Sequence, residues 1–343
     1  MDTSVLIIYT GGTIGMKTNP ETGSLAPFNF EQIEQEVPEL KKFGIKIDTF
    51  TFDPIIDSSN VKPEQWCELA SIIKKNYHAY DGFVVLHGTD TMAYTASAVS
   101  FMMQNLDKPI IFTGSQIPIG VLRTDGKENL ITAAEIAAAK ENGKSIVPEV
   151  CIYFENNLFR ANRTSKYNAD HFSAFRSYNY PPLAEAGIDI HYNYPYIRKV
   201  DAFLPSFDVA ASLCSDVVVI KLFPGITEQT LHTILSLSHI KGVVLETYGS
   251  GNAPMYDWFI NELKEAIDKG VIVLNVTQCS VGTVNMDLYD TGKELSRIGV
   301  INGRDITTEA AVTKLMYVLG QNFTRVQIIN HLTHAIRGEM TDF

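Results

Sequence analysis

The sequence predicts two α/β domains: a larger amino-terminal domain with a mostly parallel sheet, and a smaller carboxyl-terminal domain with a parallel sheet. Apolar runs of strand length alternate with helical patterns over the first half of the chain. A stretch rich in proline and tyrosine, 178–212, interrupts this alternation, which then resumes. Since 343 residues exceed what one core usually serves, we place domains at 1–190 and 213–343, joined by a linker at 191–212.

The elements of the first domain follow from apolar periodicity and from helix-start residues. Strands are expected at 5–9, 45–52, 82–86, 109–113 and 150–154. Helices are expected from Pro63, from Asp90 or Thr91 to Met103, and from Asp125 to Lys140, because these residues suit a helix start. Strands and helices that alternate at this spacing indicate βαβ units and a parallel sheet.

The second domain repeats the pattern on a smaller scale. Strands are expected at 217–222, 243–247 and 271–276. Helices are expected from Thr227, from Met255 to Gly270, from 308 to 319, and from about residue 324.

Composition excludes several classes of protein. The formal net charge of −11 argues against a nucleic-acid partner, and no apolar run approaches the roughly 20 residues that span a bilayer. The first residues enter a strand without the features of a signal peptide, so we expect a cytoplasmic protein with no membrane partner. The four cysteines are widely spaced, which suggests neither a metal site nor a disulfide framework.

Two glycine-rich turns place hydroxyl groups where ligands bind. Residues 10–15 (TGGTIG) and 87–92 (HGTDTM) each follow a predicted buried strand. In open parallel sheets the carboxyl ends of the strands form the ligand edge. A threonine hydroxyl such as that of Thr13 needs a base before it can act as a nucleophile. The alternative is a phosphate-cradling turn or a plain tight connection, although the spacing fits neither the dinucleotide fingerprint nor the P-loop.

The other candidate residues also have structural alternatives. Asp90 can hold an ammonium group or simply cap a helix, and His87 fits a packed histidine better than a general base. Lys166 is of interest only if it reaches Thr89, where a desolvated amine can accept a proton. Residues 57–59 could bind a substrate carboxylate or form a turn with a helix cap.

Together these segments resemble the bacterial-type L-asparaginase family, and within it the cytoplasmic type I enzymes. The matching segments occur in family order and are 10–16, 57–59, 87–95, 113–116, 162–166, 251–254 and 275–279. The family also includes a subunit of a tRNA-dependent amidotransferase, which carries an extra amino-terminal domain. This chain begins at the first strand, so we expect an asparaginase rather than that subunit.

The resemblance implies a set of catalytic roles. Thr13 would attack the side-chain amide carbon of L-asparagine and form an acyl-enzyme, which releases ammonia and is then hydrolysed to L-aspartate. Thr89, Asp90 and Lys166 would form a second, triad-like set, with Lys166 acting as base through Thr89 and a water. No metal or organic cofactor is implied.

The resemblance also implies how substrate is held and how the protein assembles. Asp57, Ser58, Ser59, Thr89 and Asp90 would bind the α-carboxylate and α-amino groups of the amino-acid substrate. The family site lies between the subunits of an intimate dimer, and such dimers can pair into tetramers. A glutaminase-asparaginase and a non-catalytic amino-acid sensor on the same fold are the alternative functions.

Two departures from the family pattern affect the site. Residues 22–27 (TGSLAP) lack the tyrosine that often assists the nucleophile, and Tyr289 is a possible substitute from the second domain, with a structural role equally open. The loop is still expected to close as a lid, with Gly15 and Gly23 as flexible points.

The second departure concerns regulation. Type I enzymes can carry an allosteric asparagine site, which would involve Cys279 here. Glu246 occupies the position that resembles the arginine of that site, and a carboxylate cannot donate to another carboxylate. We therefore expect Cys279 to be an ordinary buried thiol.

Overall fold

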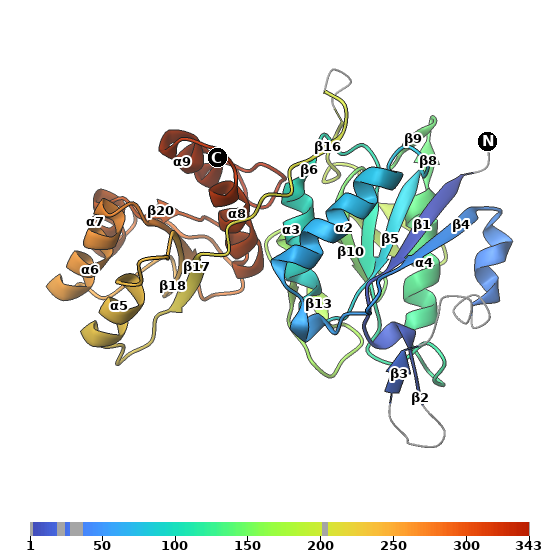
Figure 1. The fold of residues 1–343 in the computed structure, drawn as a ribbon, viewed down its shortest axis with the longest axis horizontal. Coiled ribbons are helices and arrows are strands. Elements are labelled where there is room, and N and C mark those ends of the chain that lie inside the picture. Colours follow the sequence, from blue (N-terminus) through green and yellow to red (C-terminus); the bar gives the residue numbers. More distant parts are fainter. Residues whose placement is uncertain (1–2, 19–24, 28–36, 201–204, 343) are drawn as a thin grey trace. The chain divides into compact units, whose positions relative to one another are not determined.

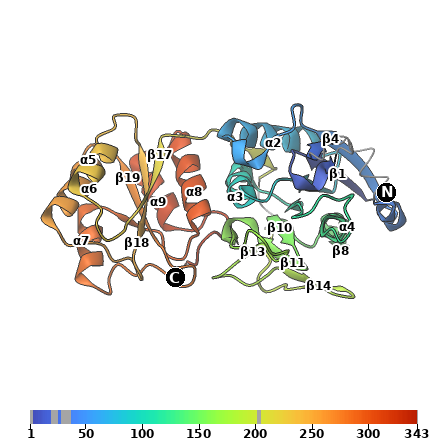
Figure 2. The ribbon, with the colours of Figure 1, turned by 90° about the horizontal axis from the view of Figure 1, so that it is seen from below.

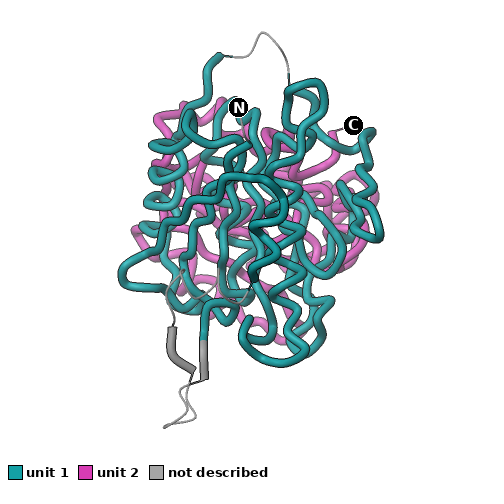
Figure 3. Tube along the Cα trace, turned by 90° about the vertical axis from the view of Figure 1, so that its right-hand side faces the viewer, with its two compact units in different colours: residues 1–210 teal, residues 211–343 magenta. Residues whose placement is uncertain are grey.

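The computed structural model describes residues 3–18, 25–27, 37–200 and 205–342. The chain forms two compact units, residues 1–210 and 211–343 (Figure 3). The division falls inside the segment 191–212 that was expected to be the linker. Each unit is an α/β structure, as predicted.

The first unit is built on a sheet with a parallel central part. Its five parallel strands lie side by side in the order β4 (Lys46–Thr51), β1 (Ser4–Tyr9), β5 (Gly82–Leu86), β7 (Ile110–Thr113) and β10 (Val150–Phe154). From β1 the chain goes to β4 on one side and then to β5 on the other. The sheet order therefore reverses between β1 and β5, and in open α/β sheets a ligand crevice forms at such a switch point.

Antiparallel strands extend the sheet beyond β10, which the sequence did not predict. These strands are β11 (Asn157–Arg160), β14 (Ala184–Ala186) and β15 (Ile190–Tyr192). Small two-stranded ladders accompany the sheet: β2 (Met16–Thr18) with β3 (Leu25–Pro27), β6 (Met103–Gln104) with β16 (Asp208–Val209), β8 (Lys140–Glu141) with β9 (Lys144–Ser145), and β12 (Ser165–Lys166) with β13 (Phe175–Arg176).

Helices cover both faces of this sheet. Helix α4 (Gly126–Ala138) packs on the face that carries Val5, Ile7 and Tyr9, and α2 (Pro63–Asn76) and α3 (Met92–Met102) lie on the other face (Figures 1 and 2). Pro63 begins α2 as predicted. Nearly every residue of α3 is buried, which matches its apolar sequence. Short 3-10 turns are η1 (Thr13–Gly15), η2 (Pro38–Phe43), η3 (Ser58–Asn60) and η4 (Ala161–Arg163).

The second unit has its own parallel sheet and core. The strands follow the order β17 (Val217–Lys221), β18 (Gly242–Thr247), β19 (Ile272–Thr277) and β20 (Ile301–Asn302). The helices are α5 (Glu228–Leu235), α6 (Asp257–Asp268), α7 (Asp290–Ile298), α8 (Thr308–Gly320) and α9 (Arg325–Thr333). Thr227 and Thr324 cap α5 and α9, as their positions in the sequence indicate. Within the described ranges, no helix is both long enough and apolar enough to cross a membrane.

Candidate active site

The turn that follows β1 is tied to the turn that follows β5. The amide and hydroxyl of Thr10 both donate to the carbonyl of Leu86, at 3.0 Å and 2.9 Å. The Thr10 carbonyl accepts from the amide of Ile56, at 2.8 Å, which attaches the segment after β4 to the same edge. Three segments far apart in sequence therefore meet at the carboxyl edge of the sheet, beside the switch point.

Glycines permit this close approach. Gly12 has φ of +96°, and a Cβ placed on it would lie 2.5 Å from the backbone nitrogen of Gly88. A Cβ on Gly88 would lie 2.5 Å from the hydroxyl oxygen of Ser58. Thr13 follows Gly12 directly and begins η1, so its position is set by the contact between the two turns.

An alanine at position 12 is therefore expected to disrupt catalysis. The added methyl group would push the turns apart, and a displacement of about 1 Å at reacting groups costs about 10²-fold in rate. Gly270→Ala is the matched control, because Gly270 has φ of +104° and no atom within 4 Å of its added Cβ. Steady-state kinetics of both variants test this prediction. Equal activity in the two variants would show that the contact with Gly88 is unimportant.

Lys166 reaches the second threonine. Its Nζ lies 2.8 Å from Thr89 Oγ1 and 2.7 Å from Asp90 Oδ1, across 77 and 76 residues of sequence. The Lys166 side chain is 18% exposed and that of Asp90 is 65% exposed, so the ammonium group is sheltered while the carboxylate opens to solvent. The structure thus brings together Thr89, Asp90 and Lys166. Their catalytic roles stay predictions.

The helix after this turn leaves Asp90 available. Helix α3 begins at Met92, and neither Asp90 nor Thr91 caps it with a side-chain hydrogen bond, contrary to one alternative from the sequence. Thr91 is the N-cap residue, but its hydroxyl donates to the Ser58 carbonyl at 2.7 Å. That bond is a further link between the 87–92 turn and the segment 57–59.

Residues 57–59 form a turn with a helix cap, which is one of the two alternatives that the sequence allowed. The Asp57 carboxylate accepts from the amide of Ser59 at 3.0 Å and from its hydroxyl at 2.7 Å, and it caps η3. These hydrogen bonds lower the pKa of Asp57. Asp57 and Ser59 are exposed whereas Ser58 is buried. Contact with a substrate stays a prediction for all three residues.

Gln116 belongs to the site although the sequence analysis gave it no role. Its Oε1 lies 3.3 Å from Thr89 Oγ1, and its side-chain amide donates to the carbonyls of Ala169 and His171, both at 3.1 Å. Asp125 was expected to cap α4, but its side chain makes no capping bond. Instead its carboxylate accepts from the backbone amide of Gln116, at 2.9 Å and 3.1 Å. Asp125 therefore holds the segment that places Gln116 beside Thr89.

His87 is a packed residue, as expected. It is 2% exposed, its Nδ1 lies 2.7 Å from the Gly88 carbonyl, and burial lowers its pKa from 6.5 to about 4. A neutral imidazole at physiological pH donates to that carbonyl and supports the turn.

The pKa of His87 predicts acid-sensitive folding. The pKa of His87 is lower in the folded protein than in the unfolded chain. Between pH 6.5 and about pH 4 the unfolded chain therefore binds a proton at His87 that the folded protein does not bind. The stability due to this group is complete above pH 6.5 and falls as the pH drops through this window, by about 3 kcal/mol in total. Urea unfolding at pH 7 and pH 4.5 should give a smaller loss in His87→Gln than in the unchanged protein. An equal loss in both would contradict the assignment.

Other predicted site residues are not joined to this cluster. Among the described residues, Thr13 Oγ1 makes no hydrogen bond with Thr89, Asp90 or Lys166. Residues 22–24 of the loop 22–27, including Gly23, lie outside the described residues, so the structure does not test the expected lid.

Residues of the second unit differ in part from expectation. Tyr289 is 52% exposed and lies at the N-cap of α7. Cys279 is exposed, so the expectation of a buried thiol was wrong; the residue follows the end of β19 in a bend rather than lying in the strand. The Glu246 carboxylate accepts from the Thr308 hydroxyl at 2.6 Å and pairs with Lys221 at 3.5 Å.

Comparisons with known proteins agree with the sequence motifs. Residues 4–198 match the family model "Asparaginase, N-terminal", and residues 216–332 match "Glutaminase/Asparaginase C-terminal domain". The chain is 43% identical over 344 residues to "L-asparaginase 1" of Escherichia coli, covering 98% of each chain. It is 40% identical to a human protein named "60 kDa lysophospholipase", covering 98% of this chain and 61% of that protein. The crystal structure of L-asparaginase I from Vibrio cholerae superposes with a TM-score of 0.90 at 42% identity, covering 99% of this chain and 100% of that one.

Proposed function

The chain belongs to the asparaginase family, and we propose that it hydrolyses L-asparagine to L-aspartate and ammonia through an acyl-enzyme on Thr13. The family and its named relatives make it an amidohydrolase. The observation that carries the proposed mechanism is the 2.8 Å contact between Lys166 Nζ and Thr89 Oγ1 at the ligand edge of the sheet.

In the first half of the reaction, the Thr13 hydroxyl oxygen attacks the side-chain amide carbon of asparagine. The hydroxyl proton passes to a base, the new C–O bond forms, and the C–N bond breaks as the leaving nitrogen takes up a proton and departs as ammonia. Backbone amides of the glycine-rich turns are suited to stabilise the negative charge that develops on the amide oxygen.

In the second half, water hydrolyses the ester on Thr13. We assign the activation of this water to the Thr89 hydroxyl, with Lys166 as the base that takes the proton. The contact of Lys166 with Asp90 supports this assignment, because a carboxylate at 2.7 Å stabilises the ammonium ion that results. Gln116, which Asp125 and two backbone carbonyls hold in place, fixes the Thr89 hydroxyl from the other side.

Substrate specificity follows from the charges at the edge of the site. In this proposal the exposed carboxylate of Asp90 accepts the α-ammonium group, and the Ser59 hydroxyl, which donates to Asp57 in the structure, turns to donate to the α-carboxylate when substrate binds. Because one methylene group changes binding by only about 1–3 kcal/mol, glutamine would be a poorer substrate rather than an excluded one.

We also propose that the protein is a cytoplasmic homodimer or a dimer of dimers. Large apolar side chains are exposed on the segments that follow the parallel strands of the second unit: Phe223, Met255, Tyr256, Val281, Leu288 and Tyr289. Exposed apolar groups that follow three neighbouring strands are typical of an interface. Tyr289 would then lie where a second subunit could use it.

Ammonia release from purified protein tests the function. We expect turnover of L-asparagine with kcat/KM about tenfold or more above that for L-glutamine. Equal turnover of the two amides would indicate a glutaminase-asparaginase. Binding of asparagine without ammonia release would indicate an amino-acid sensor, and either result would overturn the proposed specificity or activity.

A further inference from the structure

The first unit has a large cavity at the edge of its sheet opposite the candidate active site. Asp81, Lys108 and Pro148 line this cavity, and they lie just before β5, β7 and β10, at the amino ends of these parallel strands. The catalytic turns follow the carboxyl ends of β1 and β5. A five-residue strand spans about 16 Å, so a molecule in this cavity would not touch the candidate active site. The cavity volume is about 930 Å³, which suits a small organic molecule.

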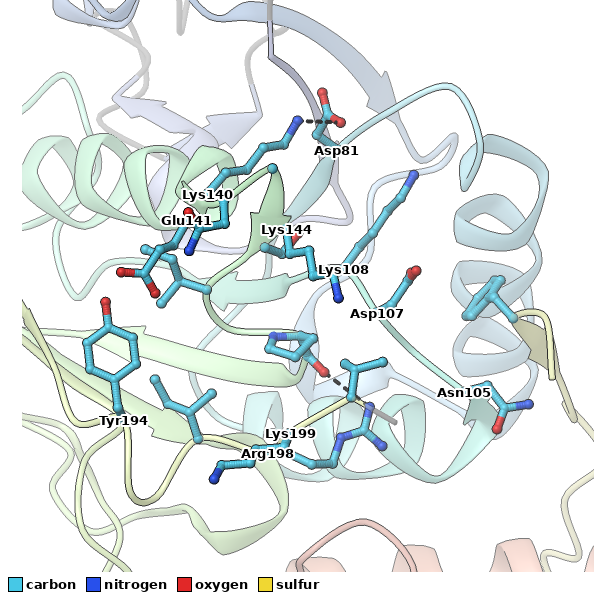
Figure 4. Close-up of a pocket in the computed structure, with 18 of the residues that line it drawn as sticks. Asp81, Asn105, Asp107, Lys108, Lys140, Glu141, Lys144, Tyr194, Arg198 and Lys199 are labelled. Carbon is cyan, nitrogen blue, oxygen red and sulfur yellow. Dashed lines mark hydrogen bonds and ion pairs between the residues drawn. The ribbon is translucent and has the colours of Figure 1, made fainter. Parts of the chain in front are cut away.

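The cavity is positively charged in a chain whose net charge is −11. Its lining carries five cationic side chains, namely Lys108, Lys140, Lys144, Arg198 and Lys199. It carries three carboxylates, namely Asp81, Asp107 and Glu141. Figure 4 shows Lys140, Lys144 and Lys108 on one side of the cavity and Arg198 and Lys199 on the other. The local charge is therefore opposite in sign to that of the whole protein.

Only part of this positive charge is compensated. Lys140 pairs with Asp81 at 2.8 Å. Arg198 donates to backbone carbonyls, which carry no net charge. Within the part of the chain that the structure describes, Lys144 and Lys199 have neither an ion-pair partner nor a side-chain hydrogen bond. These two lysines and Arg198 can thus bind an anion without breaking an existing ion pair.

The cationic side chains of the cavity also repel one another. Burial lowers the pKa of Lys108, and the charge of Lys140 lowers it further, while Asp107 and Asp81 raise it. The Lys108 ammonium is held by the carbonyls of Tyr77 and Tyr80, both at 2.6 Å. An anion in the cavity would offset this repulsion.

An aromatic surface lies beside the positive groups. Tyr194 lines the cavity and is 50% exposed, and its ring borders the cavity in Figure 4. A half-exposed ring next to uncompensated cations suits a ligand with both a planar ring and a charged group.

We propose that this cavity binds a nucleoside phosphate, with its phosphates at Arg198, Lys144 and Lys199 and its base against Tyr194. A mononucleotide or dinucleotide matches the volume, the charge and the ring. A nucleic-acid polymer does not, because the remaining surface of this acidic protein would repel it.

Calorimetric titration of the full-length protein with ADP, adenosine and inorganic phosphate tests the proposal. We expect ADP to bind at least about tenfold more tightly than either fragment. Lys144→Gln/Lys199→Gln should weaken ADP binding by about tenfold or more, since two cationic contacts are lost. Tyr194→Ala should weaken binding of ADP but not that of inorganic phosphate.

Two controls make the result decisive. Lys269→Gln removes an exposed cation directly after α6, outside the cavity lining, and should leave ADP binding unchanged. L-Aspartate should not compete with ADP, because it would occupy the other edge of the sheet. No ADP binding, unchanged binding in the double variant, inorganic phosphate binding as tightly as ADP, or competition by L-aspartate would each overturn the proposal.

Discussion

Replacing Thr13 with alanine is expected to lower kcat for L-asparagine hydrolysis by about four to six orders of magnitude, as loss of a nucleophile does in other covalent hydrolases. Alanine is smaller than threonine, and the Thr13 hydroxyl makes no hydrogen bond to the Thr89–Lys166 cluster among the described residues, so the fold should be retained. Ammonia release gives the rate, and circular dichroism confirms folding. A variant that keeps a tenth of the activity would exclude Thr13 as the nucleophile.

A second variant tests whether the two threonine-containing parts of the proposed mechanism depend on each other. Lys166→Met should lower kcat by about 10²–10⁴-fold, the usual contribution of a positioned general base. If Thr13 and Lys166 act as one unit, the double variant should be no slower than Thr13→Ala alone, because such effects are not additive. Multiplicative losses would show that the two residues act independently. Lys75→Met, at an exposed position on α2, is the control and should keep full activity.

The parallel strands could be predicted from the sequence because each is a buried apolar run with a helix pattern after it. Because these strands are buried on both faces of the sheet, successive residues must all be apolar, as Phe83, Val84 and Val85 of β5 are. The antiparallel strands β14 and β15 could not be predicted in this way. They have three residues each, and pairing with a neighbour rather than their own composition makes them strands. Helix α7 was missed because it is short and mostly polar.

The candidate site was predictable where glycine and hydroxyl residues meet a strand end, and less so elsewhere. Gly12 and Gly88 signal tight turns, and the structure gives the reason in their mutual approach. The contact of Lys166 with Thr89 depends on tertiary folding across 77 residues. The sequence could therefore indicate only that Lys166 would matter if it reached Thr89. Gln116 lies in a segment that matches the family, but nothing around it in the sequence indicated a contact with Thr89. Asp125 carried no signal of its role, since an aspartate before a helix is usually a cap.

A buried ion pair in the second unit accounts for the other large expected effect. Lys314 of α8 and Glu339 of the carboxyl-terminal segment are fully buried, with Nζ and Oε1 2.6 Å apart. The carboxylate also accepts from the backbone amides of Ile336 and Arg337, and the ammonium donates to the carbonyl of His334 at 2.8 Å. Burial lowers the pKa of Lys314, and the charge of Glu339 opposes that change. This pair holds the segment after α9 against α8.

Glu339→Gln is expected to lower the free energy of unfolding by about 3–5 kcal/mol, because it leaves a buried ammonium ion without a counter-charge. Lys314→Met should cost less, since the Glu339 carboxylate keeps its backbone amide donors. The double variant should recover part of the loss, because no uncompensated charge remains. Glu265→Gln breaks an exposed pair with Lys269 and serves as the matched control, with no measurable change expected. Chemical denaturation measures all four variants. If Glu339→Gln behaves like Glu265→Gln, the carboxyl-terminal segment must be held by its backbone and apolar contacts rather than by this charge.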